Sequence, residues 1–138
     1  MRITPCFNLK LRQAARVLTN HYDGYLRELG ITVTQFSIMR SLWYMKNTSQ
    51  KELQEVLVLQ QTTLTRNLKP LIRSGYIQTH TSPDDGRVSI VSLTEAGETL
   101  FQQARKYWKQ AQDNVASKLG ENVSAQLLQV ADAIIELR

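Results

Sequence analysis

The sequence of 138 residues holds one cysteine and two histidines, and this scarcity narrows the function. Cys6 has no second cysteine to pair with, so the chain forms no internal disulfide, which fits a reducing compartment. His21 and His80 stand in neither a metal-ligand nor a triad spacing with Cys6, and no glycine-rich phosphate loop occurs. We therefore expect no metal site, no cofactor and no catalytic residue, and we do not expect an enzyme.

Long hydrophobic runs are also missing. The longest apolar stretch is far shorter than a membrane span, and the first residues lack the apolar segment and cleavage site of a secretory signal. We therefore expect a cytoplasmic protein without a membrane partner. Hydrophobic residues make up 42% of the chain and charged residues 21%, which is typical of one globular domain over 1–138.

Acidic residues are absent from two stretches of the chain, although the whole carries a formal net charge of +5. No acid precedes Asp23, and none lies between Glu55 and Asp84. Cations do occur there, namely Arg2, Lys10, Arg12 and Arg16 in the first stretch and Arg66, Lys69 and Arg73 in the second. Two local cationic zones favour a polyanionic partner more than a uniform excess of charge would.

Hydrophobic periodicity predicts a mainly helical chain. We expect helices over about 6–29, 34–45, 50–59, 60–75, 95–119 and 124–137. The first helix starts at Thr4-Pro5, Thr34 caps the second, Ser49 caps the third in a capping box with Glu52, and Thr94 caps the fifth. In the third helix, Leu53, Val56 and Leu57 form the expected buried side. A turn is expected over 47–49.

The period changes to alternation in "YIQTH" and "VSIVSL", which are rich in β-branched residues. The segment "TSPDDGR" between them has strong turn chemistry, so we expect a hairpin with a projecting loop. Arg87 on this loop is suited to the narrow minor groove of DNA, and Asp85 can hold its guanidinium by a charge-assisted pair. The alternative is an ordinary exposed turn with an incidental ion pair.

The segment "QQTTLTRNLKPLIRSG" divides into two faces when it is placed on a helix. Its apolar face holds Leu64, Leu68, Leu71 and Ile72. The opposite face carries cations and short polar side chains without an acid, and the candidate DNA contacts are Gln61, Thr62, Thr63, Thr65, Arg66, Lys69 and Arg73. Arginine, glutamine and threonine can each recognise base edges, whereas lysine more often contacts phosphate. The alternative is a plain amphipathic surface helix.

The segments "TQFSIMRSL", "QKELQEVLVLQQTTLTRNLKPLIRSGYI" and "PDDGRVSIVSLTEAG" together resemble the MarR family of bacterial transcriptional regulators. The wing run carries the most specific match, with Asp85 and Arg87 in the D-x-R pattern of that family. The resemblance implies a winged helix-turn-helix with a DNA-binding lobe over about 31–93 and dimerisation helices over about 1–30 and 95–138. It further implies a homodimeric repressor on a pseudo-palindromic double-stranded DNA operator. A winged-helix module that binds protein is the alternative function.

The resemblance also suggests two kinds of effector that would release DNA. Cys6 lies in "CFNL", which is similar to the context of the reactive cysteine in the organic-hydroperoxide-sensing branch, and Tyr22 matches a tyrosine that hydrogen-bonds that cysteine. The alternative is a small buried or interfacial cysteine. A small aromatic acid is the second kind of effector, and its candidate pocket comprises Arg16, His21, Tyr22, Tyr25, Trp43 and Tyr44. Aromatic residues at helical spacing also suit a plain core.

Overall fold

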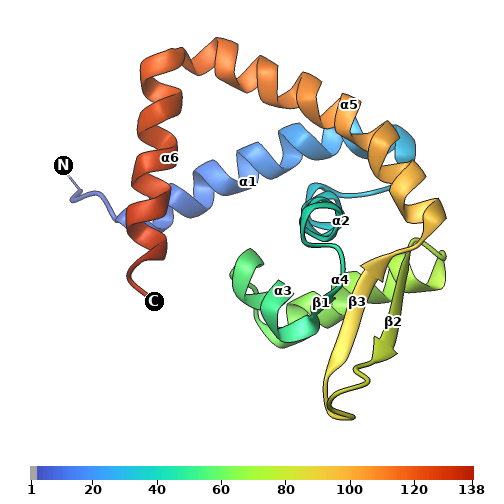
Figure 1. Ribbon diagram of the computed structural model, residues 1–138. Helices are drawn as coiled ribbons and strands as arrows, with labels where there is room; N and C mark the ends of the chain where they lie inside the picture. Colours follow the sequence, from blue (N-terminus) through green and yellow to red (C-terminus); the bar gives the residue numbers. More distant parts are fainter. Residues whose placement is uncertain (1–2) are drawn as a thin grey trace.

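The computed structural model describes residues 3–138 and is mainly helical with a small sheet (Figure 1). Its elements in chain order are α1 (Phe7–Leu26), η1 (Arg27–Leu29), α2 (Val33–Met45), β1 (Thr48–Ser49), α3 (Gln50–Leu57), α4 (Gln61–Arg73), β2 (Ile77–Thr81), β3 (Ser89–Leu93), α5 (Glu95–Leu119) and α6 (Glu121–Ile135). The expected helices and the hairpin are therefore confirmed, and their order is that of a winged helix-turn-helix between long helices.

The sheet contains one strand that the sequence did not predict. Its order is β1-β3-β2, and all pairs are antiparallel. Thr48 pairs with Val91 and Ser49 pairs with Ile90, where we expected a turn. Two residues are too few to show a strand period, and Thr48 is buried against β3, so the pairing arises from the fold.

Three of the expected helix starts were wrong. The first helix begins at Phe7 with Cys6 as its N-cap, beyond Thr4-Pro5, and α6 begins at Glu121, three residues earlier than expected. The N-cap of α2 is Thr32 instead of Thr34. Thr32 Oγ1 accepts a hydrogen bond from the Gln35 amide at 3.2 Å, and Gln35 Oε1 accepts one from the Thr32 amide at 3.0 Å. This reciprocal capping box satisfies two backbone donors, which Thr34 cannot do.

The caps of α3 and α5 were placed correctly. Ser49 Oγ accepts from the Glu52 amide at 3.0 Å, although the Glu52 carboxylate bonds the Thr48 hydroxyl at 3.1 Å and does not complete the box. Thr94 Oγ1 accepts from the Gly97 amide at 3.0 Å and donates to the carbonyl of Gly75. Thr94 therefore fastens the start of α5 to the end of the α4 segment.

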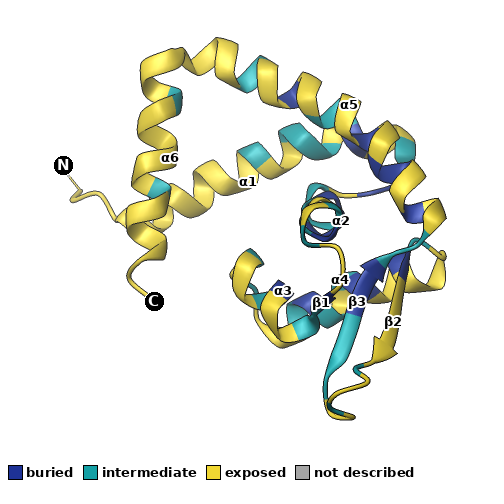
Figure 2. Cartoon of the chain, viewed as in Figure 1, coloured by how far each residue is buried: buried dark blue, intermediate teal, exposed yellow. Residues whose placement is uncertain are grey.

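One hydrophobic core joins α2, α3, α4 and the sheet, which we call the head, to the first half of α5 (Figure 2). Phe36 of α2 stacks on Phe101 of α5 with ring centroids 5.5 Å apart. Leu64, Leu68 and Leu71 lie in this core, as expected for α4. Two apolar residues were wrongly placed inside. Ile72 is 39% exposed and Val56 is 57% exposed.

Helices α1 and α6, which we call the arm, are mostly exposed (Figures 1 and 2). The end of α1 packs on the head through Leu26, and Arg138, just after α6, donates to the Glu55 carbonyl of α3 at 3.1 Å. Leu26 is the buried residue of α1, and α6 has none among the residues that the structure describes. Large apolar side chains are nevertheless exposed there: Phe7, Leu9, Leu11 and Val17 on α1, and Val123, Leu127, Leu128, Val130, Ile134 and Ile135 on α6. This area of apolar surface is unusual for a protein that stays monomeric.

Candidate nucleic-acid interface

Helix α4 presents the polar face that its sequence predicts. Its three core leucines fix the rotation of the helix, so the opposite side is turned to solvent. The exposed polar side chains on this helix are Gln61, Thr62, Arg66, Lys69 and Arg73, while Thr63 and Thr65 are half-buried. Throughout residues 3–138, no acidic side chain forms an ion pair with these three cations. Their charges are therefore available to a partner.

Two of the candidate threonines are held by neighbouring side chains. Gln50 Nε2, at the start of α3, donates to Thr65 Oγ1 at 3.2 Å, and Asn67 Nδ2 donates to the carbonyl of Thr63 at 2.9 Å. Thr65 keeps its hydroxyl proton and methyl group for another contact. Sequence reasoning missed Gln50, because this contact joins two helices and leaves no local pattern.

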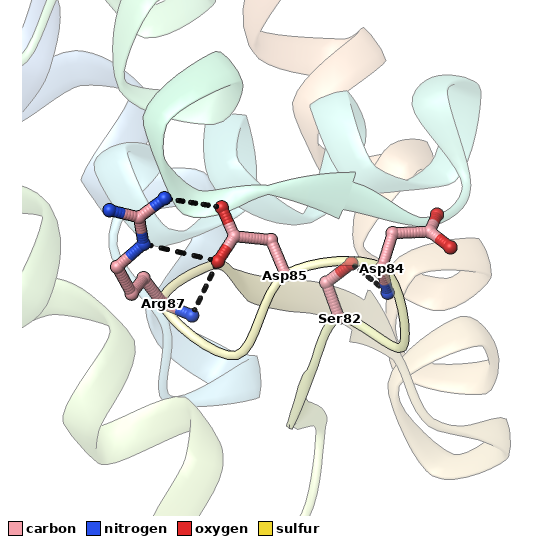
Figure 3. A network of polar contacts seen from close by, with 4 residues as sticks. All are labelled: Ser82, Asp84, Asp85 and Arg87. Atoms are coloured by element: carbon pink, nitrogen blue, oxygen red, sulfur yellow. Dashed lines mark hydrogen bonds and ion pairs between the residues drawn. The ribbon is translucent and has the colours of Figure 1, made fainter.

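The wing loop holds Arg87 in a fixed orientation (Figure 3). Asp85 Oδ1 accepts from the backbone amide of Arg87 at 3.0 Å and from its Nε at 3.2 Å, and Oδ2 accepts from Nη2 at 3.4 Å. These bonds, the backbone one first, lower the pKa of the Asp85 carboxyl below its ordinary value. The Arg87 side chain is 91% exposed. The expected pair of Asp85 and Arg87 is thus confirmed, and it leaves the guanidinium open to solvent.

The two candidate redox residues lie apart within one chain. Cys6 is exposed and is the N-cap of α1, so it is not buried in this chain. Tyr22 lies 16 residues further along the same helix, a distance of about 24 Å at 1.5 Å per residue. Its hydroxyl donates to Gln112 Oε1 of α5, and burial raises the pKa of Tyr22 above its ordinary value.

The six candidate pocket residues do not line one cavity. His21 packs against Tyr22 and Tyr25 with ring centroids 6.0 and 5.3 Å apart. Trp43 packs on Phe101 in the core, 5.2 Å between centroids. The remaining members are Tyr44, which the Arg40 guanidinium contacts, and Arg16, which lines an open groove on α1. A cavity of about 160 Å³ lies between α1, α5 and α6, and Tyr22 is the member of the candidate set that lines it.

Two further observations bear on the kind of site. Residues 3–138 contain no cluster of three or more metal-ligating side chains. Within the same residues, no helix combines the length and the apolar character needed to cross a bilayer.

Comparisons with known proteins identify the fold and the family. Residues 31–89 match the family model described as "MarR family". The chain is 34% identical over 94 residues to the organic hydroperoxide resistance transcriptional regulator of Bacillus subtilis, and 33% identical over 84 residues to the multiple antibiotic resistance protein MarR of Salmonella typhimurium. The matched segments cover 68% and 61% of this chain but only 64% and 58% of those relatives, less than two thirds of either.

Solved structures match almost the entire chain. The transcriptional regulator MOSR of M. tuberculosis, in complex with DNA, has a TM-score of 0.84 at 30% identity and covers 97% of this chain and 99% of its own. The transcriptional regulator PA4135 has a TM-score of 0.86 at 24% identity, over 98% and 99% of the two chains. A mutant MarR from E. coli with operator DNA has a TM-score of 0.83 at 23% identity, over 92% and 91%. The two structures under 25% identity confirm the fold. The family-model match over residues 31–89, together with the 34% identity to the Bacillus subtilis regulator and the 30% identity to MOSR over almost its whole length, shows that the chain belongs to the MarR family.

Proposed function

We propose that the protein is a sequence-specific double-stranded DNA-binding transcriptional regulator. In this proposal α4 enters the major groove, Arg87 enters the adjacent minor groove, and the head over about 31–93 is the DNA-binding lobe. The observation that carries the proposal is the acid-free outward face of α4 beside an exposed arginine that Asp85 orients. Such a surface neutralises phosphates and offers hydrogen-bond partners to base edges.

A homodimer completes this function. The exposed apolar residues of α1 and α6 form a large uncovered surface that a second copy of the chain would cover. We propose that α1, α5 and α6 form the dimer interface and that two heads bind half-sites about 34–36 Å apart. MOSR and the E. coli MarR mutant were solved with DNA, which supports DNA as the partner of this chain.

Two substitutions on α4 test whether its outward face recognises bases. Arg66→Ala should lower affinity by about 1–3 kcal/mol per contact and relax the base preference, because a bidentate contact to guanine is lost. Lys69→Ala should weaken all duplexes evenly, because lysine contacts phosphate. The measurement is a selection from random duplexes followed by titration. The control is Lys106→Ala on α5, which is first shown by sedimentation to remain a dimer. Equal and uniform losses from both variants would show that Arg66 touches phosphate.

The alternative is a winged-helix module that binds a protein, since a fold alone does not determine function. Salt dependence separates the two functions. Operator binding by a dimer should weaken steeply as salt rises, because each phosphate contact releases counterions. A flat response, or no duplex binding at all, would favour the protein-binding module.

We further propose that an effector releases the DNA, so that the protein acts as a repressor. Cys6 is exposed in the single chain, which supports oxidative release. If so, peroxide should release DNA from the wild type but not from Cys6→Ser. Release by both proteins would argue against Cys6. If the effector is instead an aromatic acid, titration with phenolic acids should change the tryptophan fluorescence of the protein. The duplex should be released over the same range of ligand concentration.

A further inference from the structure

A groove of about 460 Å³ lies between α3, the start of α4 and the wing. Gln50, Lys51 and Gln54 of α3 form one side, Gln61 is the first residue of α4, and Arg87 forms the wing side. Among the described residues that line this groove, none is acidic and two are cationic. The groove therefore suits an anion. No pattern in the sequence had indicated a role for Gln50, Lys51 or Gln54.

The position of the groove follows from how a winged helix straddles DNA. The major and minor grooves of a duplex are separated by one sugar–phosphate backbone. If α4 occupies the major groove and Arg87 the neighbouring minor groove, that backbone must pass between them. The surface between the first residue of α4 and the wing is this groove, because Gln61 and Arg87 both line it.

We propose that this groove seats the DNA backbone and that Lys51 is a phosphate-binding residue. The inference rests on the proposed DNA-binding function and extends it to α3. Lys51 is exposed and, within residues 3–138, forms no ion pair with an acid, so its ammonium is available to a phosphate oxygen. Gln50, the neighbour of Lys51, donates a hydrogen bond to Thr65. In this proposal the same edge of α3 therefore contacts the DNA backbone and positions a side chain of α4.

A salt titration tests the proposal. The probe is the duplex that the wild-type protein selects from a random pool. The variants are Lys51→Gln and the control Lys106→Gln, whose side chain is exposed on α5 and which is first shown by sedimentation to remain a dimer. Each lost phosphate contact lowers the slope of log affinity against log salt by about 0.9, so a dimer of Lys51→Gln should lose about 1.8. Between 50 and 200 mM salt, the wild type should then weaken about 12-fold more than the variant.

Further readouts separate a backbone contact from other roles. Lys51→Gln should reselect the same base preference and keep the thermal midpoint, because the side chain is exposed. Single phosphates of the duplex can be replaced one at a time by neutral methylphosphonates. At one position per half-site, this replacement should weaken duplex binding by the wild type but not by Lys51→Gln.

The possible failures are distinguishable. An unchanged salt slope in Lys51→Gln, with wild-type binding still steep in salt, would overturn the role of Lys51 and leave the proposed function standing. A changed base preference would show that Lys51 contacts bases and would also overturn the proposal. No salt-dependent duplex binding by the wild type would remove the proposed function itself.

Discussion

The head and the arm bury their apolar residues to very different extents. The core lies in the head and the first half of α5, where the exposed large apolar residues are Tyr44, Val56, Val58 and Ile72. In the arm, by contrast, Leu26 is the buried residue of α1, and α6 has none among the residues that the structure describes. Val17 on α1 is 69% exposed and Leu128 on α6 is 66% exposed. Because buried apolar area is the main favourable term in folding, the head gains this stabilisation within one chain, and the arm requires a second surface to gain it.

Backbone strain is found in the same region as the core. Among the described residues, Lys46 and Val58 are the non-glycine positions with positive φ, at +65° and +54°, and both lie in the head. Lys46 ends α2, and Val58 ends α3 just before α4. A left-handed β-branched residue is costly and persists where surrounding packing enforces it. The well-packed region therefore also contains the strained turns.

The largest expected effect comes from charging the arm. Leu128→Glu should give a monomer at micromolar concentration in sedimentation, because a carboxylate would be buried in the proposed interface. Duplex affinity should then fall by about 100-fold or more, since two linked heads bind far more tightly than one. The control Val56→Glu changes a valine of α3 that is 57% exposed, and it should leave the dimer intact. A dimeric Leu128→Glu would place the interface elsewhere.

The second prediction concerns the contact between α5 and the head. A Cβ atom added to Gly97 would lie 2.0 Å from the Tyr76 carbonyl oxygen. Either the backbone at Tyr76 or the start of α5 would therefore have to shift. Gly97→Ala should lower the free energy of unfolding by about 1–3 kcal/mol in denaturant titration. In the control Gly24→Ala the new Cβ meets no atom within 4 Å, and this change should stabilise α1 by up to about 1 kcal/mol. Equal effects would contradict the clash.

The third prediction tests the strain at the end of α3. A left-handed conformation costs an ordinary residue about 1–2 kcal/mol, while glycine adds less than about 1 kcal/mol of unfolded-state entropy. Val58→Gly should therefore raise the free energy of unfolding slightly, by less than about 1 kcal/mol. Val56→Gly, inside α3, should lower it by about 0.5 kcal/mol, because glycine has a lower helix propensity than valine. Destabilisation by both variants would show that the Val58 side chain outweighs the strain.

The smallest expected effect is the loss of folding stability at acid pH when Asp85 is protonated. The folded pKa of Asp85 is lowered, so its pair with Arg87 contributes stability above the unfolded pKa of about 3.9, and this is lost as pH falls through the folded value. Because the pair is exposed, salt should weaken it. NMR titration should show the Asp85 pKa returning toward its ordinary value in Arg87→Ala. An unchanged pKa would mean that the backbone amide alone causes the shift.

Much of the candidate site could be predicted from sequence because its signals are local. The three core leucines of α4 set its polar face, and "PDDGR" contains both partners of the Asp85–Arg87 pair. Thr32 was missed as the cap of α2, because another threonine stands two residues later and the Asp23 carboxylate, from α1, also accepts from the Val33 amide at 2.7 Å. The role of Gln50 was missed because its hydrogen-bond partner, Thr65, is 15 residues away in the chain.

The sequence by itself determined the order of the helices, the hairpin and the cationic face of α4, because period, caps and charge act over a few residues. Only the tertiary structure decided that β1 joins the sheet, that Ile72 and Val56 face solvent, and that Lys51 shares a groove with Arg87. Those outcomes depend on how helices rotate and pack against one another, and residues far apart in the chain set that packing together.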